Sequence, residues 1–121
     1  MMTTSELILR EWPYLALALS CVLTAYLLLI IGGRPASNEL WNDPLVVFGL
    51  ELPIYMFHQF EEHGIDLFGN RYGFQASLCS SLGYKTVSSC PATELFIFAV
   101  NPGSVWISGA LAWLFARDKA L

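Results

Sequence analysis

Charged residues are scarce in this sequence. Of its 121 residues, 13% are charged and 55% are hydrophobic, whereas a soluble domain carries about 25% charged residues. Lys and Arg total 6 against 10 Asp and Glu, and they form no basic run. Nucleic acid is therefore excluded as an expected partner, because phosphate binding needs clustered Lys and Arg. The composition predicts an integral membrane protein with a single membrane domain, residues 1–121, in contact with the lipid bilayer.

Cysteine is also sparse, and its spacing excludes some classes of site. The three cysteines form no C-x-x-C pair, so neither a zinc ribbon nor a thioredoxin-like site is indicated. Cys21 lies in an apolar run, where a thiol behaves as a small hydrophobic group. Cys79 and Cys90 flank a polar segment. They can form a disulfide if that segment faces an oxidising compartment, or remain free thiols, and the sequence leaves both alternatives open.

Long hydrophobic runs are abundant, by contrast. A helix needs about 20 apolar residues to cross a bilayer, and we predict three such spans at about residues 14–32, 45–63 and 95–116, with a long loop at 64–92. The first run is longer than the apolar core of about 7–15 residues in a signal peptide, which favours a retained helix over a cleaved signal. The predicted fold is all-α, a multi-span transmembrane helical protein.

Several local signals refine this arrangement. Asp43 and Pro44 can cap and start the second span. The Asn-Pro-Gly triplet at residues 101–103 is expected to kink or break the third span. Because long structureless loops are uncommon, a short surface helix or re-entrant piece is expected around residues 74–82.

The distribution of positive charge does not assign the orientation in the membrane. Positive residues favour the cytoplasmic side, but in a three-span arrangement they divide equally between the two sides. One side has Arg10, Arg71 and Lys85, and the other has Arg34, Arg117 and Lys119.

The second span ends in the sequence MFHQFEEH, which contains both histidines of the chain. At about 100° per residue, one side of this helix gathers polar residues, while His63 lies off that side and Pro53 lies nearly opposite. We call this side the polar seam; its members are Glu51, Tyr55, His58, Glu61 and Glu62. Ionisable residues within a span are costly and usually face a bundle interior or a cavity. The seam therefore predicts a site that another helix or a cavity must satisfy.

The pair His58 and Glu62 is the centre of this predicted site. Residues at i and i+4 lie about 6 Å apart along a helix axis, so both side chains can converge on one ion or one proton. Imidazole and carboxylate suit a divalent metal such as Zn or Fe. Glu51, about 10.5 Å from His58, is assigned a supporting role, as are Tyr55 and Asn101. A catalytic zinc has three protein ligands, so other spans must contribute.

The segment His58-Gln59-Phe60-Glu61-Glu62 resembles the signature of the H-x-x-E-E family of small integral membrane proteins. The likeness covers about residues 45–75 and includes the Gly64 turn and a later Asn101. The resemblance implies an all-helical, multi-span membrane protein with His58, Glu61 and Glu62 as its site. The family's biochemical role is not established. Its members generally continue into further spans, which implies a shortened member or a chain that needs partner subunits.

Two functions follow from these residues. The first is an enzyme acting on a small hydrophobic substrate, in which His58 and Glu62 serve as metal ligands or an acid–base pair and Glu61 assists. The second is a non-catalytic membrane subunit whose polar seam docks a partner helix or a second copy of the chain. An enzyme predicts a cavity that reaches His58 and Glu62. A docking subunit predicts that Glu51, His58 and Glu62 lie on an open face of the isolated chain.

Overall fold

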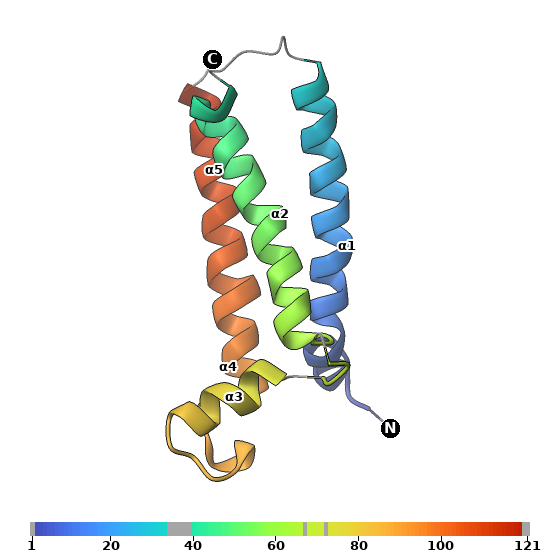
Figure 1. Cartoon of the computed structure of the whole chain (residues 1–121), viewed down its shortest axis with the longest axis vertical. Coiled ribbons are helices and arrows are strands. Elements are labelled where there is room, and N and C mark those ends of the chain that lie inside the picture. The colour runs from blue at the N-terminus through green and yellow to red at the C-terminus, as the bar shows by residue number, and fades with distance from the viewer. Residues whose placement is uncertain (1, 34–39, 67, 72, 120–121) are drawn as a thin grey trace.

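The computed structural model describes residues 2–33, 40–66, 68–71 and 73–119. Three long helical segments run side by side (Figure 1): α1 (Thr4–Gly32), α2 (Pro44–His63), and a third in which α4 (Glu94–Phe98), the π-helix η3 (Ala99–Trp106) and α5 (Ile107–Lys119) follow without interruption. Short 3₁₀ turns lie at Leu40–Asn42 (η1) and Val87–Ser89 (η2). The described residues contain no strand, which confirms the all-α prediction.

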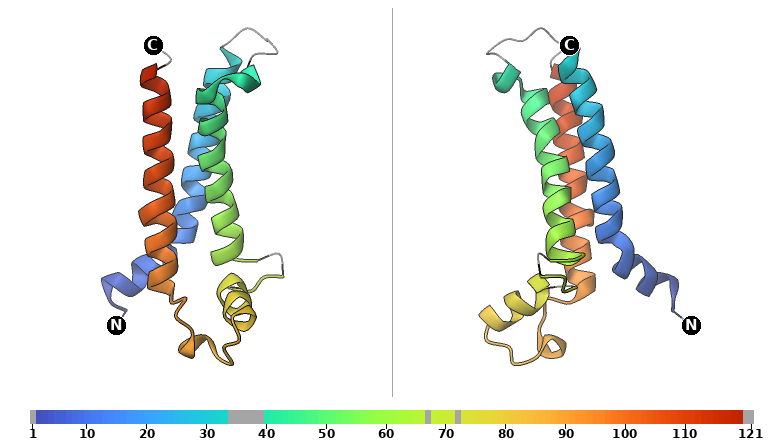
Figure 2. Two further views of the ribbon diagram at one scale, coloured as in Figure 1. Left: turned by 90° about the vertical axis from the view of Figure 1, so that its left-hand side faces the viewer. Right: turned by 45° about the vertical axis from the view of Figure 1, so that its right-hand side comes forward.

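Helix α1 begins earlier than the span predicted at 14–32. The hydroxyl of Thr3 accepts a hydrogen bond from the backbone N–H of Glu6, and the Glu6 carboxylate accepts one from the backbone N–H of Thr3. This reciprocal cap starts the helix ten residues upstream. Pro13 lies inside α1, and the N-terminal part of the helix bends away from the bundle (Figure 2). A proline inside a helix causes such a bend because it removes a hydrogen bond.

Helix α2 begins as predicted. The Asp43 carboxylate accepts a hydrogen bond from the backbone N–H of Leu45, and Pro44 occupies the first turn. The helix packs against both α1 and α5. Gly49 allows α1 to approach closely, since a Cβ added there would lie 2.7 Å from a methyl carbon of Leu27. The buried Ser20 hydroxyl of α1 donates a hydrogen bond of 2.7 Å to the carbonyl of Pro53. These contacts fix which face of α2 turns inward.

The sequence predicts a kink or a break at residues 101–103, and the structure shows that the break is wrong. The chain stays helical through Asn101 and Pro102 because it widens into the π-helix Ala99–Trp106. A proline has no N–H and its ring clashes with the carbonyl four residues earlier. A π turn, which pairs residues five apart, accommodates such a residue and is frequently found at functional sites.

The expected loop at 64–92 contains helix α3 (Gly73–Ser81), which confirms the short helix predicted there. Cys79 and Cys90 form a disulfide, so the bonded alternative is the one found. Both cysteines are buried, together with Ala92. The buried Gln75 side chain donates a hydrogen bond of 2.8 Å to the Ala92 carbonyl. This segment lies beneath the bundle, at the end where α2 finishes and α4 begins (Figure 1).

By length and composition, two helices of the described chain are long and apolar enough to cross a membrane, Thr4–Gly32 and Glu94–Asp118. Large apolar side chains lie exposed on both, such as Leu29 (78%) and Phe115 (66%). Helix α2 has 20 residues, but its polar residues place it outside this pair. The prediction of three spans is thus confirmed only in its coarser part, an all-helical fold with two candidate spans.

Candidate functional site

The polar seam of α2 brings His58 and Glu62 together as predicted. The Nε2 atom of His58 lies 3.1 Å from Oε1 of Glu62, across one helical turn. The second carboxylate oxygen of Glu62 lies 3.9 Å from Nε2 of His63. Glu62 therefore stands between the two histidines. The first contact follows from helical spacing; the second was missed because His63 lies off the seam on a helical wheel.

The supporting residues form a separate contact higher on α2. The Tyr55 hydroxyl donates a hydrogen bond of 2.5 Å to Oδ1 of Asn101, which belongs to the π-helix. Glu51 and Tyr55 line a groove of about 320 Å³ between α2 and the third helix, with Ser108 on the opposite wall. The structure thus joins Tyr55 to Asn101, whereas Glu51 contributes only to the groove.

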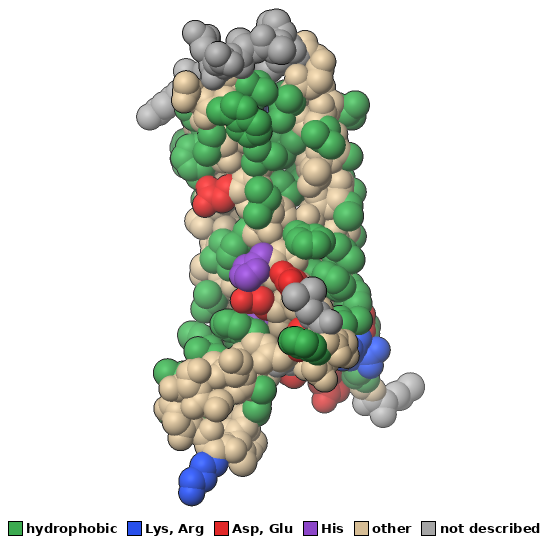
Figure 3. Space-filling model, viewed as in Figure 1, with side chains coloured by type: hydrophobic (Ala, Val, Ile, Leu, Met, Phe, Trp, Pro, Cys, Tyr) green, Lys and Arg blue, Asp and Glu red, His purple; other side chains and the backbone are tan. Residues whose placement is uncertain are grey.

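The residues of the polar seam differ in how far they are exposed to the outside of the chain. The side chain of His58 is 53% exposed and that of Glu62 is 25% exposed. Glu51 is exposed and Glu61 is half-buried. Histidine and acidic side chains gather on this face of the space-filling view, above α3 (Figure 3). The centre of the seam therefore opens to the outside of the isolated chain, since α1 and α5 cover other faces of α2.

The opposite face of α2 carries a second polar pair that sequence reasoning missed. Gln59 is 3% exposed and His63 is 1% exposed. The His63 ring lies 5.3 Å from the Trp12 ring and 5.1 Å from the Phe74 ring, measured between centroids. The Gln59 carbonyl oxygen and both nitrogens of His63 have no hydrogen-bond partner among the described residues. The i,i+4 spacing of Gln59 and His63 was the available signal.

The predicted metal site requires several metal-ligating side chains close together. A single metal centre in a protein usually has at least three protein ligands. Within the described residues, no three His, Cys, Asp or Glu side chains gather closely enough to hold a metal ion. His58 and Glu62 provide two donors of a suitable kind. One chain therefore supplies only part of such a site.

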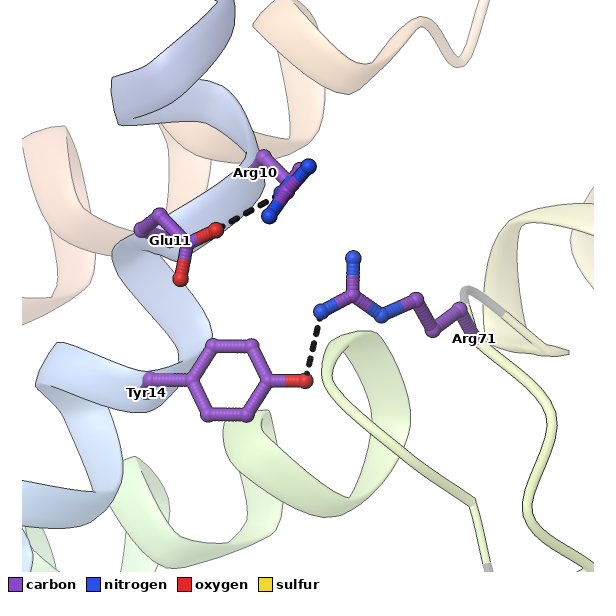
Figure 4. A network of polar contacts seen from close by, with 4 residues as sticks. All are labelled: Arg10, Glu11, Tyr14 and Arg71. Carbon is purple, nitrogen blue, oxygen red and sulfur yellow. Dashed lines mark hydrogen bonds and ion pairs between the residues drawn. The ribbon is translucent and has the colours of Figure 1, made fainter.

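Side-chain contacts connect the segment that follows α2 to helix α1. The Arg71 guanidinium donates a hydrogen bond of 2.7 Å to the Tyr14 hydroxyl (Figure 4), and it lies 5.5 Å from the centre of the Tyr14 ring. On the same helix, Nε of Arg10 donates to Oε1 of Glu11 at 2.7 Å. These contacts place the turn that follows the seam beside the N-terminal part of α1.

The turn itself is built around Gly64 and Asp66. A Cβ added at Gly64 would lie 2.7 Å from the Phe60 carbonyl oxygen, so a glycine fits best where α2 ends. Oδ1 of Asp66 accepts hydrogen bonds from the backbone N–H groups of Asn70 and Phe68. These bonds, above all the one from Asn70, hold the pKa of Asp66 below its usual value of 3.8. The Asp66 carboxylate thus orders the turn as an anion.

No protein-family model, curated protein or solved structure matches this chain. The likeness to the H-x-x-E-E family stays a prediction from the motif. What the fold defines is the class: an all-helical chain with two helices long and apolar enough to cross a membrane.

Proposed function

We propose that this protein is an integral membrane subunit with three spanning helices, whose polar seam on α2 docks a partner helix. One observation carries the proposal: His58, 53% exposed, lies with exposed Glu51 on an open face of α2. In a bilayer that face would meet lipid. Placing a charged side chain at the centre of a spanning helix costs about 2.5–3.5 kcal/mol. A partner helix that pairs with these groups offsets this cost.

The disulfide supports an orientation for this subunit. Disulfides persist on the oxidising side of a membrane, and Cys79–Cys90 lies between the second and third helical segments. The proposed orientation therefore places α3 and the His58–Glu62 end of α2 toward the oxidising compartment. Trp41, before the start of α2, lies toward the other side.

Cysteine labelling in sealed vesicles of known sidedness tests this orientation. In a Cys21→Ala background, Cys79 and Cys90 are bonded to each other, and Val87→Cys adds a thiol between them at a position that is 42% exposed. We expect a membrane-impermeant maleimide to label Val87→Cys from the oxidising side alone. A Trp41→Cys variant, at a position 67% exposed, should be labelled from the opposite side alone. Labelling of both from one side would contradict the three-span arrangement.

The second candidate is an enzyme that acts on a small hydrophobic substrate. The observation that favours it is the 3.1 Å approach of His58 to Glu62, since an imidazole and a carboxylate held this close can exchange a proton with a bound molecule. Such an enzyme needs the pair to be enclosed, so that water and lipid headgroups are excluded. The open face of the isolated chain favours docking, and a docked partner would also supply the enclosure.

Photo-crosslinking tests the docking proposal. A benzophenone amino acid replaces Phe57, which is 54% exposed beside His58, and as a matched control replaces Phe115, which is 66% exposed on α5. We expect a protein crosslink from position 57 in native membranes, lost when His58→Ala and Glu62→Gln are added. Position 115 should yield no protein crosslink that depends on these two residues. Equal patterns at both positions would contradict docking through the seam.

A further inference from the structure

Glu51 is the carboxylate of the polar seam that lies furthest from either end of α2. At a rise of about 1.5 Å per residue, it lies about 10.5 Å along the helix from Pro44 and about 18 Å from His63. Glu61 and Glu62, by contrast, belong to the last turn of α2. An α2 helix that spans the membrane therefore carries Glu51 within the hydrocarbon core, where an unpaired charge is costly.

The predicted spans of this chain contain no basic residue. All six Lys and Arg residues lie outside them, at positions 10, 34, 71, 85, 117 and 119. Glu51 forms no ion pair or hydrogen bond with any residue that the structure describes. A second copy of the chain has the same distribution of charge, so it offers no cation at the depth of Glu51 either. A positive charge that complements Glu51 must therefore come from a different molecule.

The groove beside Glu51 presents hydrogen-bond acceptors. Its polar lining consists of Glu51, Tyr55 and Ser108. The Tyr55 hydroxyl donates its hydrogen to Oδ1 of Asn101, and the Ser108 hydroxyl donates to the carbonyl of Val105 at 3.1 Å. A hydroxyl has one hydrogen to donate, and an ionised carboxylate has none. These three side chains can therefore accept further hydrogen bonds, but they have no hydrogen left for a ligand.

This combination of charge and acceptors favours a cationic donor. A lysine ammonium has three N–H donors and an arginine guanidinium has five. The remaining walls of the groove are apolar, and such walls suit the aliphatic stem of either side chain. They are formed by Phe48, Leu52, Val105, Gly109 and Ala112. The groove thus matches a long basic side chain both in its charge and in its apolar walls.

A spanning helix is the carrier of that side chain which the position of Glu51 favours. A lipid-soluble amine can move its ammonium to the hydrated membrane surface, whereas a helix holds a central basic residue at a fixed depth. Such a residue is itself costly in the hydrocarbon core, so pairing with Glu51 relieves the cost of both charges.

We propose that a different membrane protein docks on α2 with a spanning helix whose lysine or arginine enters this groove and pairs with Glu51. This proposal rests on the docking function above and names the chemistry of the partner. The Tyr55 and Ser108 hydroxyl oxygens accept further hydrogen bonds from the same basic group.

Synthetic spanning helices test the pairing. One probe is a peptide of about 20 Leu and Ala residues with a single central lysine, and its matched control has norleucine in place of that lysine. Association with the whole chain in phosphatidylcholine vesicles is measured by energy transfer between attached dyes. We expect the lysine peptide to bind about tenfold more tightly than the norleucine peptide. Equal binding of the two peptides would overturn the proposal.

Substitutions in the protein locate the effect. Glu51→Gln removes the charge and should abolish the preference for lysine, whereas Glu51→Lys should reverse it in favour of a peptide with a central glutamate. Glu94→Gln is the control, since it removes a charge at an exposed position at the start of α4, outside both the groove and the polar seam. It should leave the preference unchanged. A lysine preference that persists in Glu51→Gln would overturn the proposal, and circular dichroism checks that every variant stays helical.

Crosslinking in native membranes then tests the chemistry of the natural partner. A benzophenone amino acid replaces Phe48, which lines the groove and is 40% exposed, and the crosslinked peptide is sequenced by mass spectrometry. We expect a spanning helix of another protein with a lysine or arginine inside its apolar run, and a much weaker crosslink in Glu51→Gln.

The outcomes separate this inference from the docking function. A crosslink from position 57 that depends on His58 and Glu62, to a helix without a basic residue, would overturn the pairing with Glu51 and leave docking in place. No protein crosslink from position 48 or 57 would overturn both proposals. Binding of dodecylamine that depends on Glu51 would in that case assign the groove to a lipid-soluble amine.

Discussion

The two faces of α2 carry similar polar residues and meet opposite surroundings. Gln59 and His63 are almost fully buried, and the His63 ring packs against Trp12 of α1 and Phe74 of α3. His58 and Glu62 belong to the same two turns but lie open or half-open. The inward pair is enclosed by its own chain, whereas the outward pair needs something outside it. The polar end of α2 thus packs on one face, and it leaves the other face open for the docking proposed above.

The largest change in unfolding free energy is expected when a buried apolar residue of α2 is truncated, compared with an exposed one. Met56 is 4% exposed on the inward face, and Ile54 is 65% exposed on the outward face. Met56→Ala should destabilise the monomer by about 2–5 kcal/mol because it leaves a cavity. Ile54→Ala should change the free energy of unfolding by less than about 0.5 kcal/mol. Unfolding of diluted, monomeric protein in detergent measures both, and equal losses would mean that the two faces do not differ.

The end of α2 should tolerate a methyl group poorly. Gly64→Ala brings a Cβ to 2.7 Å from the Phe60 carbonyl oxygen, which should cost about 1–3 kcal/mol of unfolding free energy through overpacking. Gly103→Ala is the control, since a Cβ there would meet no atom within 4 Å. The same unfolding assay compares them. A neutral Gly64→Ala variant would show that the turn relaxes freely.

The outward pair should contribute little to the stability of the monomer. An exposed i,i+4 pair is worth about 0.3–0.5 kcal/mol, so His58→Ala should hardly change the unfolding of diluted monomer. The same variant should abolish the crosslink from position 57 in membranes. A loss of several kcal/mol in the monomer would instead assign His58 to packing, which would remove the contrast between the faces.

The smallest effect concerns the turn between α2 and α3. The pKa of Asp66 is held below 3.8 chiefly by the Asn70 backbone N–H. Its stabilising contribution is therefore fully present above about pH 3.8 and is lost as the pH falls through the lower, folded pKa. An NMR titration of the Asp66 carboxyl carbon should show a midpoint below 3.8. A midpoint at or above that value would mean that the turn hydrogen bonds do not form in solution.

Much of the local structure could be predicted from the sequence. The Asp43–Pro44 start of α2 follows from residue types at fixed positions. The short helix near residue 74 was expected because long structureless loops are uncommon. The approach of His58 to Glu62 could be predicted as well, because helical geometry sets it. Of the kink or break predicted at residues 101–103, the break was wrong, because the chain widens into a π turn and stays helical through Pro102.

The sequence by itself therefore determined the helices, their apolar character and the polar seam, because these depend on residues a few positions apart. Only the tertiary structure decided which face of α2 turns inward, through the contacts of Gly49 and Pro53 with α1. It also joined Tyr55 to Asn101 and Cys79 to Cys90. Such contacts depend on how separate helices and loops pack, and local periodicity does not encode that arrangement.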